Sequence, residues 1–113
     1  MELCPDYLRA YIQAHIGEIG NAEDVARQLG LPYENLRKTF RRRTGTSLAR
    51  YIECVRIETA KRLLVETDLL CFEVAHRVGY DREDTAARAF RRSTGLTMGE
   101  YRTLAKAHLI RAA

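Results

Sequence analysis

Residues 40–45 read Phe-Arg-Arg-Arg-Thr-Gly, and residues 90–95 read Phe-Arg-Arg-Ser-Thr-Gly. The segments ahead of them also match, with Val-Ala-Arg-Gln-Leu-Gly at residues 25–30 and Val-Ala-His-Arg-Val-Gly at residues 74–79. A self-similarity of this length predicts one supersecondary element that the chain uses twice.

Each repeat is typical of a helix-turn-helix unit. Ala26-x-x-x-Gly30 and Ala75-x-x-x-Gly79 place a small residue where two helices can cross, and then a glycine where the backbone must turn. Apolar residues recur at helical spacing along the chain, and no alternation of the strand type is present. The sequence therefore predicts an all-α fold with helices at about residues 7–16, 22–29, 33–43, 48–66, 71–78, 83–93 and 98–108.

Several residues indicate where these helices begin and end. Asp6 is the expected N-cap of the first helix, and Gly17 and Gly20 are expected to end it. Three further caps are expected from short polar patterns, namely Asn21-x-x-Asp24, Ser47 and Thr97-x-x-Glu100. Gly45 is expected to end its helix in the left-handed conformation.

Composition limits the class of protein. The 113 residues carry a net charge of +4, with 46% hydrophobic and 30% charged residues. This composition predicts one small folded domain, or two tightly joined subdomains, with a moderate bias towards anionic partners. The three cysteines form no C-x-x-C pair, so a reducing cytoplasm is expected, with Cys54 and Cys71 buried on apolar faces. No membrane span, metal-ligand spacing, cofactor-binding motif or catalytic motif is present, so we expect neither a membrane protein nor an enzyme.

Arginine and lysine gather on the second helix of each repeat, and such side chains can donate to guanine or to phosphates when a helix lies in the major groove. For one isolated helix, a solvated charged face is the simpler interpretation. Two turn signatures, each followed by the same arginine-rich helix end, favour DNA binding instead.

The long helix at residues 48–66 offers a geometric reason for DNA binding. About 19 residues make a rod of roughly 30 Å, and successive major grooves on one face of B-DNA lie roughly 34 Å apart. A rigid helix of this length between two reading heads could place both heads on one face of a duplex.

Over residues 7–104 the chain resembles the DNA-binding domain of the arabinose-operon regulator (AraC/XylS) family of bacterial transcription factors. Three stretches carry the resemblance: Leu36-x-x-x-Phe40-x-x-x-Thr44-Gly45-x-Ser47-x-x-x-Tyr51-Ile52, then Arg56-Ile57-x-x-Ala60-x-x-Leu63-Leu64, and Val74-Ala75-x-x-Val78-Gly79-Tyr80 followed by Ala89-Phe90-Arg91-Arg92-x-Thr94-Gly95. The resemblance implies seven helices, two helix-turn-helix units, a linker helix, and promoter binding that usually activates transcription.

Within one AraC-type domain at residues 1–113, we expect a first subdomain at about 6–46, a linker helix at 47–66 and a second subdomain at about 67–108. By motif position, the resemblance implies that the residues facing bases are Glu34, Arg37 and Lys38 in the first unit and Glu83, Asp84, Ala87 and Arg88 in the second. Arg41 and Arg42, near a helix end, are the expected phosphate contacts. The full predicted DNA-binding set is Glu34, Asn35, Arg37, Lys38, Arg41, Arg42, Arg82, Glu83, Asp84, Ala87, Arg88, Arg91 and Arg92.

The second unit departs from the family pattern. Ala86 stands where the family usually buries a large apolar residue, which predicts a smaller and less stable core. Three acids also lie near the start of its recognition helix, so residues 78–95 carry a net charge of +1 against +4 for residues 29–45. The segment Leu69-Leu70-Cys71-Phe72 is unusually apolar. We expect it to add core packing. The alternative is that Leu70 and Phe72 are exposed and contact RNA polymerase or a missing domain.

Two alternatives to specific DNA binding remain open at this stage: a protein-interaction module that has lost DNA binding, and a non-specific basic nucleic-acid binder. Family members often carry a separate effector or dimerisation domain. The expectation for this chain is therefore either an excised C-terminal domain or a naturally short regulator.

Overall fold

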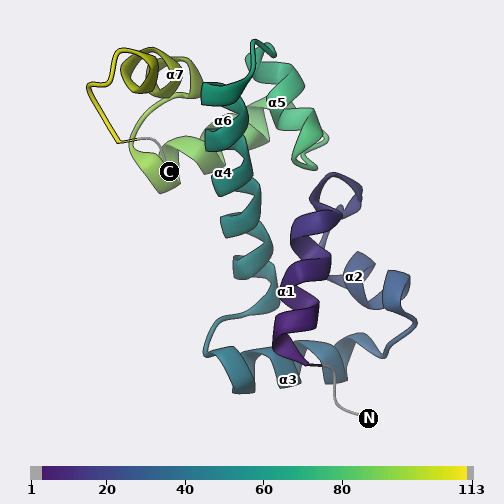
Figure 1. The fold of residues 1–113 in the computed structure, drawn as a ribbon. Helices are drawn as coiled ribbons and strands as arrows, with labels where there is room; N and C mark the ends of the chain where they lie inside the picture. The colour runs from purple at the N-terminus through teal and green to yellow at the C-terminus, as the bar shows by residue number, and fades with distance from the viewer. Residues whose placement is uncertain (1–3, 112–113) are drawn as a thin grey trace. The chain divides into compact units, whose positions relative to one another are not determined.

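The computed structural model describes residues 4–111, and within that range the chain is all-α, without strands (Figure 1). Its elements are α1 (Pro5–Ala14), the 3-10 helix η1 (Ile16–Glu18), α2 (Ala22–Leu29), α3 (Tyr33–Thr44), α4 (Leu48–Glu66), α5 (Cys71–Arg77), α6 (Glu83–Thr94) and α7 (Met98–Lys106). The predicted fold class, with seven α-helices, is confirmed. Most helix ends lie where they were predicted, and the others differ by one or two residues, as is usual at fraying helix ends.

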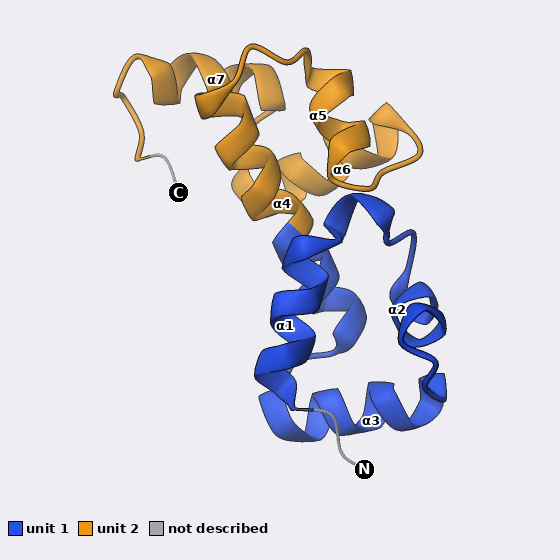
Figure 2. Cartoon of the chain, turned by 45° about the vertical axis from the view of Figure 1, so that its right-hand side comes forward, with its two compact units in different colours: residues 1–55 blue, residues 56–113 orange. Residues whose placement is uncertain are grey.

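The chain divides into two compact units, and the division falls inside α4 (Figure 2). Unit 1 ends at Val55 and unit 2 begins at Arg56. The subdomain boundaries expected from the sequence, on either side of α4, stay a prediction.

Unit 1 has a hydrophobic core of its own, to which α1, α2, α3 and the first half of α4 contribute. Its buried residues are Leu8, Ile12, Ile16, Ile19, Ala22, Val25, Ala26, Leu36, Phe40, Leu48, Ile52 and Val55. The rings of Phe40 and Tyr51 lie 5.5 Å apart, and Gln13 donates to the Tyr51 hydroxyl at 3.3 Å. Tyr51 is thus a packing residue with a polar tip.

Unit 2 repeats this arrangement with the second half of α4 and with α5, α6 and α7. Its buried residues are Ile57, Ala60, Leu64, Val74, Ala75, Val78, Tyr80, Ala86, Ala89, Phe90, Met98, Tyr101 and Ala105. The rings of Phe90 and Tyr101 also lie 5.5 Å apart. Ala86 is 2% exposed, so the position expected to hold a large apolar side chain is a core position filled by alanine.

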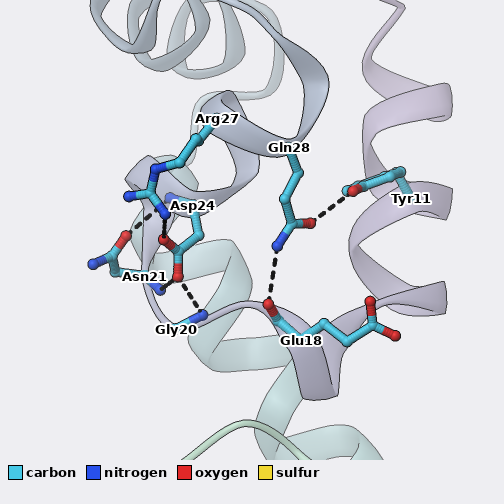
Figure 3. Close-up of polar contacts among 7 residues, drawn as sticks. All are labelled: Tyr11, Glu18, Gly20, Asn21, Asp24, Arg27 and Gln28. Carbon is cyan, nitrogen blue, oxygen red and sulfur yellow. Dashed lines mark hydrogen bonds and ion pairs between the residues drawn. The ribbon is translucent and has the colours of Figure 1, made fainter.

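The caps predicted at Asn21, Ser47 and Thr97 are confirmed. The Asn21 side chain accepts from the Asp24 N–H, and the Asp24 carboxylate accepts from the Asn21 N–H, which makes a reciprocal capping box at the start of α2 (Figure 3). Thr97 and Glu100 form the same box at the start of α7. The Ser47 hydroxyl accepts from the Arg50 N–H at 3.1 Å and caps α4.

The prediction for the ends of the first helix was wrong. Pro5, whose fixed φ and missing N–H suit a first turn, is the first residue of α1, and the N-cap is Cys4 rather than Asp6. The helix ends at Ala14, and Gly17 lies inside η1. The tighter turn of η1 allows both Ile16 and Ile19 to reach the core.

The expectation that Cys54 is buried was also wrong, because its side chain is exposed. Within α4, Leu48, Ile52 and Val55 face the core of unit 1, while Ile57, Ala60 and Leu64 face the core of unit 2. Cys54 lies outside both rows of buried residues. Cys71 is partly buried and packs against the core of unit 2.

Polar side chains fasten α1, η1 and α2 together in unit 1 (Figure 3). The Tyr11 hydroxyl donates to the Gln28 amide oxygen at 2.6 Å, and the Gln28 amide nitrogen donates to the Glu18 carbonyl at 2.9 Å. These bonds hold the first helix of the helix-turn-helix unit against the elements that precede it.

Asp24→Asn is expected to destabilise unit 1 by about 1 kcal/mol at neutral pH, since a charged cap of the α2 dipole is lost. The carboxylate accepts from the Gly20 N–H at 2.7 Å and also pairs with Arg27, and these contacts, the Gly20 bond first, lower the pKa of Asp24 below 3.8. A lowered pKa in the folded state gives stability that is present above the unfolded pKa and is lost as the pH falls through the folded pKa.

Urea unfolding of the wild-type protein and of Asp24→Asn, between pH 7 and pH 2, measures how the stability difference depends on pH. The stability difference should be largest at pH 7 and should shrink below pH 4. Asp6→Asn, which removes an exposed acid from the first turn of α1, is the control and should change stability little. A difference between Asp24→Asn and wild type that does not vary with pH would contradict the electrostatic explanation.

Candidate nucleic-acid interface

The recognition helix of unit 1 is α3, and a tight turn after α2 sets its direction. Gly30 has φ +68°, and the Leu31 N–H bonds back to the Ala26 carbonyl at 2.9 Å, which closes the C-terminus of α2 in the manner of a Schellman motif. Ala26 is only 2% exposed, so its small side chain lies in the core where the two helices meet. The structure therefore confirms the turn that the Ala-x-x-x-Gly pattern predicted.

One side of α3 is buried and the other carries the predicted DNA-binding residues. Leu36 and Phe40 face the core. Arg37 is partly exposed, and the other predicted residues of this helix are exposed, namely Glu34, Asn35, Lys38, Arg41 and Arg42. The structure thus gathers the predicted DNA-binding residues of unit 1 on the side of α3 that faces away from the core.

Arg37 lies against Glu34 on this surface. The Nη2 atom of Arg37 donates to Oε2 of Glu34 at 2.8 Å, one helical turn away. The pKa of Glu34 lies below its usual value, chiefly because of this hydrogen bond. The guanidinium is therefore held on the exposed side of α3.

The recognition helix of unit 2 is α6, which follows a comparable turn. Gly79 has φ +103°, and the Tyr80 N–H bonds to the Ala75 carbonyl at 3.1 Å. Ala86, Ala89 and Phe90 face the core of unit 2. All residues of the second predicted set are exposed. They lie on α6 or directly before it, namely Arg82, Glu83, Asp84, Ala87, Arg88, Arg91 and Arg92.

Asp84 lies between two arginines. Arg82 Nε and Nη2 donate to its two carboxylate oxygens at 3.1 and 3.4 Å, and Arg88 Nη1 lies 3.9 Å from Oδ2. These contacts lower the pKa of Asp84, and the hydrogen bond from Arg82 is the largest cause. The acidic start of α6 is thus partly neutralised by its own neighbours, which the count of charges along the sequence could not show.

The ends of α3 and α6 explain why Thr-Gly recurs. Thr44 Oγ1 donates to the Phe40 carbonyl at 2.8 Å and accepts from the Thr46 N–H, and Thr94 makes the same pair of bonds with Phe90 and Leu96. The glycine that follows each threonine has a positive φ, +78° at Gly45 and +82° at Gly95. The repeated motif therefore ends each recognition helix at the same point and turns the chain towards the next helix.

The sequence analysis did not predict the contacts of Glu34 and Asp84 with arginines. The spacing of three residues between Glu34 and Arg37 was a signal that could have indicated one of them. For residues 69–72, the structure supports part of each of the two interpretations. Leu69 and Cys71 pack against the core, but Leu70 and Phe72 are 57% and 53% exposed. The N–H of Leu70 donates to Glu73 at 2.9 Å, which fixes Leu70 as the residue before the helix, with its side chain outside the core.

No helix within residues 4–111 is long and apolar enough to cross a membrane. No group of three or more His, Cys, Asp or Glu side chains in that range could hold a metal ion.

Comparison with known proteins gives consistent matches. Residues 25–104 match the model of a helix-turn-helix domain family. The chain is 28% identical over 97 residues to the lactose operon transcription activator of Staphylococcus xylosus, an overlap that covers 86% of this chain and 33% of that protein. The chain spans about a third or less of the length of the curated relatives it matches.

Solved structures match the fold over most of the chain. The C-terminal domain of AraT, a response regulator from Geobacillus stearothermophilus, is 31% identical with a TM-score of 0.78, over 88% of this chain and 83% of that one. The DNA-binding domain of the global transcriptional factor AdpA, in complex with a target DNA, is 26% identical with a TM-score of 0.82, over 92% of this chain and 94% of that one.

Proposed function

Since the chain belongs to the AraC/XylS family of helix-turn-helix proteins, we propose that it binds promoter DNA in a sequence-specific manner and activates transcription. In this proposal α3 and α6 read two adjacent major grooves. A cytoplasmic location follows from a role at bacterial promoters.

The observation that carries the proposal is the matching exposure of cations on α3 and α6. Lys38, Arg41 and Arg42 recur fifty positions later as Arg88, Arg91 and Arg92, and all six are exposed. The opposite side of each helix is buried in its own core. A helix anchored on one side, with cations on the other, matches the way recognition helices enter the major groove.

The similarity to the AdpA domain supports the same proposal, because that domain was solved on a target DNA. At 26% identity the property that the two domains share is the fold, which presents α3 and α6. We therefore propose that the fold supplies the docking mode and that the exposed residues supply the target sequence.

The exposure of Leu70 and Phe72 favours a second role at the same promoter. Two large apolar side chains that the fold leaves in water are suited to a protein contact. We propose a contact with RNA polymerase or with a separate effector or dimerisation domain, in addition to the DNA contact.

Selection of bound sequences from a random pool of duplex DNA tests the function. We expect one enriched sequence, which the protein binds at least a thousandfold more tightly (~10³) than unrelated DNA, with a steep salt dependence. Salt dependence without such a ratio would instead indicate a non-specific nucleic-acid binder. No DNA binding at all would indicate a protein-interaction module.

Arg37→Ala and Arg42→Ala should have different effects on DNA binding. Arg37 lies in the middle of α3, so its loss should weaken the selected sequence about tenfold and relax the preference at one or two base positions. Arg42 lies near the helix end, so its loss should weaken all sequences alike and lower the salt slope by about one unit. Binding of both variants to selected and scrambled duplexes at several salt concentrations measures the two effects.

Arg62→Ala is a suitable control, because Arg62 is exposed on α4, outside the predicted surface. It should change neither the preference for bases nor the ratio between the two duplexes. Equal losses on every DNA for Arg37→Ala and Arg42→Ala would show that the proposed division between base and phosphate contacts is wrong.

A further inference from the structure

Glu34 and Asp84 occupy equivalent positions in the two units. Each is the second residue of its recognition helix, and they lie fifty positions apart, the same spacing as Phe40 and Phe90. An acid in the first turn favours the helix dipole, but it also faces a polyanion if the proposed function holds. Its presence at the same place in both units needs a further reason.

In both units this acid contacts an arginine of the exposed helix surface. Glu34 accepts from Arg37 at 2.8 Å. Asp84 accepts two hydrogen bonds from Arg82, at 3.1 and 3.4 Å, and lies 3.9 Å from Arg88. The arginines differ in position between the units, while the acid is retained.

These contacts are poor candidates for stabilising the fold. The side chains of Arg82 and Asp84 are 75% and 53% exposed, and those of Arg37 and Glu34 are 42% and 64% exposed. Exposed ion pairs contribute little to folding because water screens them. Their effect should therefore lie in where the guanidinium groups are held.

A held guanidinium can still bind DNA. It carries five N–H donors, so one bond to Glu34, or two to Asp84, leaves donors for a base edge or a phosphate. A flexible arginine loses rotamer freedom when it is ordered at an interface. If a carboxylate has already ordered it in the unbound protein, less freedom is lost on binding.

We infer that Glu34 and Asp84 are positioning residues for DNA recognition: Glu34 holds Arg37, and Asp84 holds Arg82 and Arg88, in the orientation that specific binding requires. This inference rests on the proposed function. It assigns to the two acids a role in specificity. If the acids acted only by repelling phosphates, they would weaken binding to every sequence and would not affect specificity.

Four variants, each of which removes one negative charge, test the inference. Glu34→Gln and Asp84→Asn disrupt the positioning contacts. Glu58→Gln is the control for the first, because Glu58 pairs with Lys61 at 3.1 Å with the same spacing of three residues, on α4. Asp68→Asn is the control for the second, because Asp68 pairs with Lys106 at 3.4 Å and neither residue belongs to α3 or α6.

The quantity to measure is the ratio of affinities for the selected and a scrambled duplex, at one salt concentration, for variants shown by circular dichroism to be folded. Removing a negative charge should raise the affinity for scrambled DNA slightly in all four variants. Only Glu34→Gln and Asp84→Asn should lower the ratio, by roughly threefold each, which is the size of effect that an exposed ion pair allows. Asp84→Glu, which keeps a carboxylate within reach of Arg82, should retain most of the wild-type ratio.

A double-mutant cycle separates positioning from a direct base contact by Asp84. If Asp84 acts through its arginines, Asp84→Asn should lower the ratio much less when Arg82 and Arg88 are already alanine. Additive losses would overturn the inference, and so would ratios that match those of the control variants. A wild-type protein without any specificity ratio would overturn the proposed function and this inference with it.

Discussion

Ala60→Pro is expected to lower the affinity for the selected DNA far more than the affinity for unrelated DNA. Ala60 is 3% exposed and lies in the interior of α4, a continuous helix of 19 residues, five positions after the end of unit 1. Proline there removes the hydrogen bond to the carbonyl of Arg56 and forces its ring against that carbonyl, at a cost of about 3 kcal/mol or more.

The unequal effect follows from the role predicted for α4. Specific binding by two reading heads requires the spacing that a continuous helix provides, whereas non-specific attraction to phosphates requires only the charges. A kink in α4 changes the spacing and leaves the charges as they are.

Binding to the selected and scrambled duplexes measures both affinities. Ala60→Gly is the matched control, because glycine keeps the N–H and should cost only about 1 kcal/mol without a kink. If folded Ala60→Pro protein keeps the wild-type ratio of specific to non-specific affinity, α4 is not a rigid spacer.

Most of the fold follows from local chemistry that the sequence displays. The capping boxes at Asn21 and Thr97, the positive φ of Gly45 and the start of α4 after Ser47 were all predicted, because each depends on residues within four positions of one another. The errors occurred where a choice between local options depends on the core. Gly17 could have ended a helix, but a 3-10 turn there buries Ile16 and Ile19.

The candidate site shows the same division. The exposed sides of α3 and α6 were predictable, because the helical period separates Leu36 and Phe40 from the cations. The contacts of Arg82 with Asp84 were not, since they depend on a side-chain rotamer and on the extended backbone at Arg82 ahead of α6. The exposure of Leu70 and Phe72 was one of two alternatives, and the choice between them depends on where α5 begins, to within one residue.

Phe90→Ala is expected to destabilise unit 2 by about 3–5 kcal/mol. Phe90 is 1% exposed and packs edge-on against the ring of Tyr101 in the core that fixes α6. The core residues of α6 beside it, Ala86 and Ala89, are both alanines that cannot move into the space the ring leaves. The cavity should therefore stay largely open, and the docking of α6 should be lost first.

Phe40→Ala in unit 1 is the matched comparison, because Phe40 is 2% exposed and packs on Tyr51 at the same 5.5 Å. The residue equivalent to Ala86 is Leu36, a larger buried side chain that can lean into the vacated space. Since the cost of a cavity depends on how far its surroundings collapse, Phe40→Ala should cost about 1 kcal/mol less than Phe90→Ala.

Denaturant unfolding, combined with hydrogen exchange of the amides of each unit, resolves the two effects. Phe90→Ala should reduce protection in α5, α6 and α7 and leave most protection in α1, α2 and α3, because each unit has its own core. Equal costs for the two variants, or a larger cost for Phe40→Ala, would mean that the alanines of α6 do not set the stability of unit 2. The lower net charge of residues 78–95, +1 against +4 for residues 29–45, would then be the remaining predicted difference between the two units.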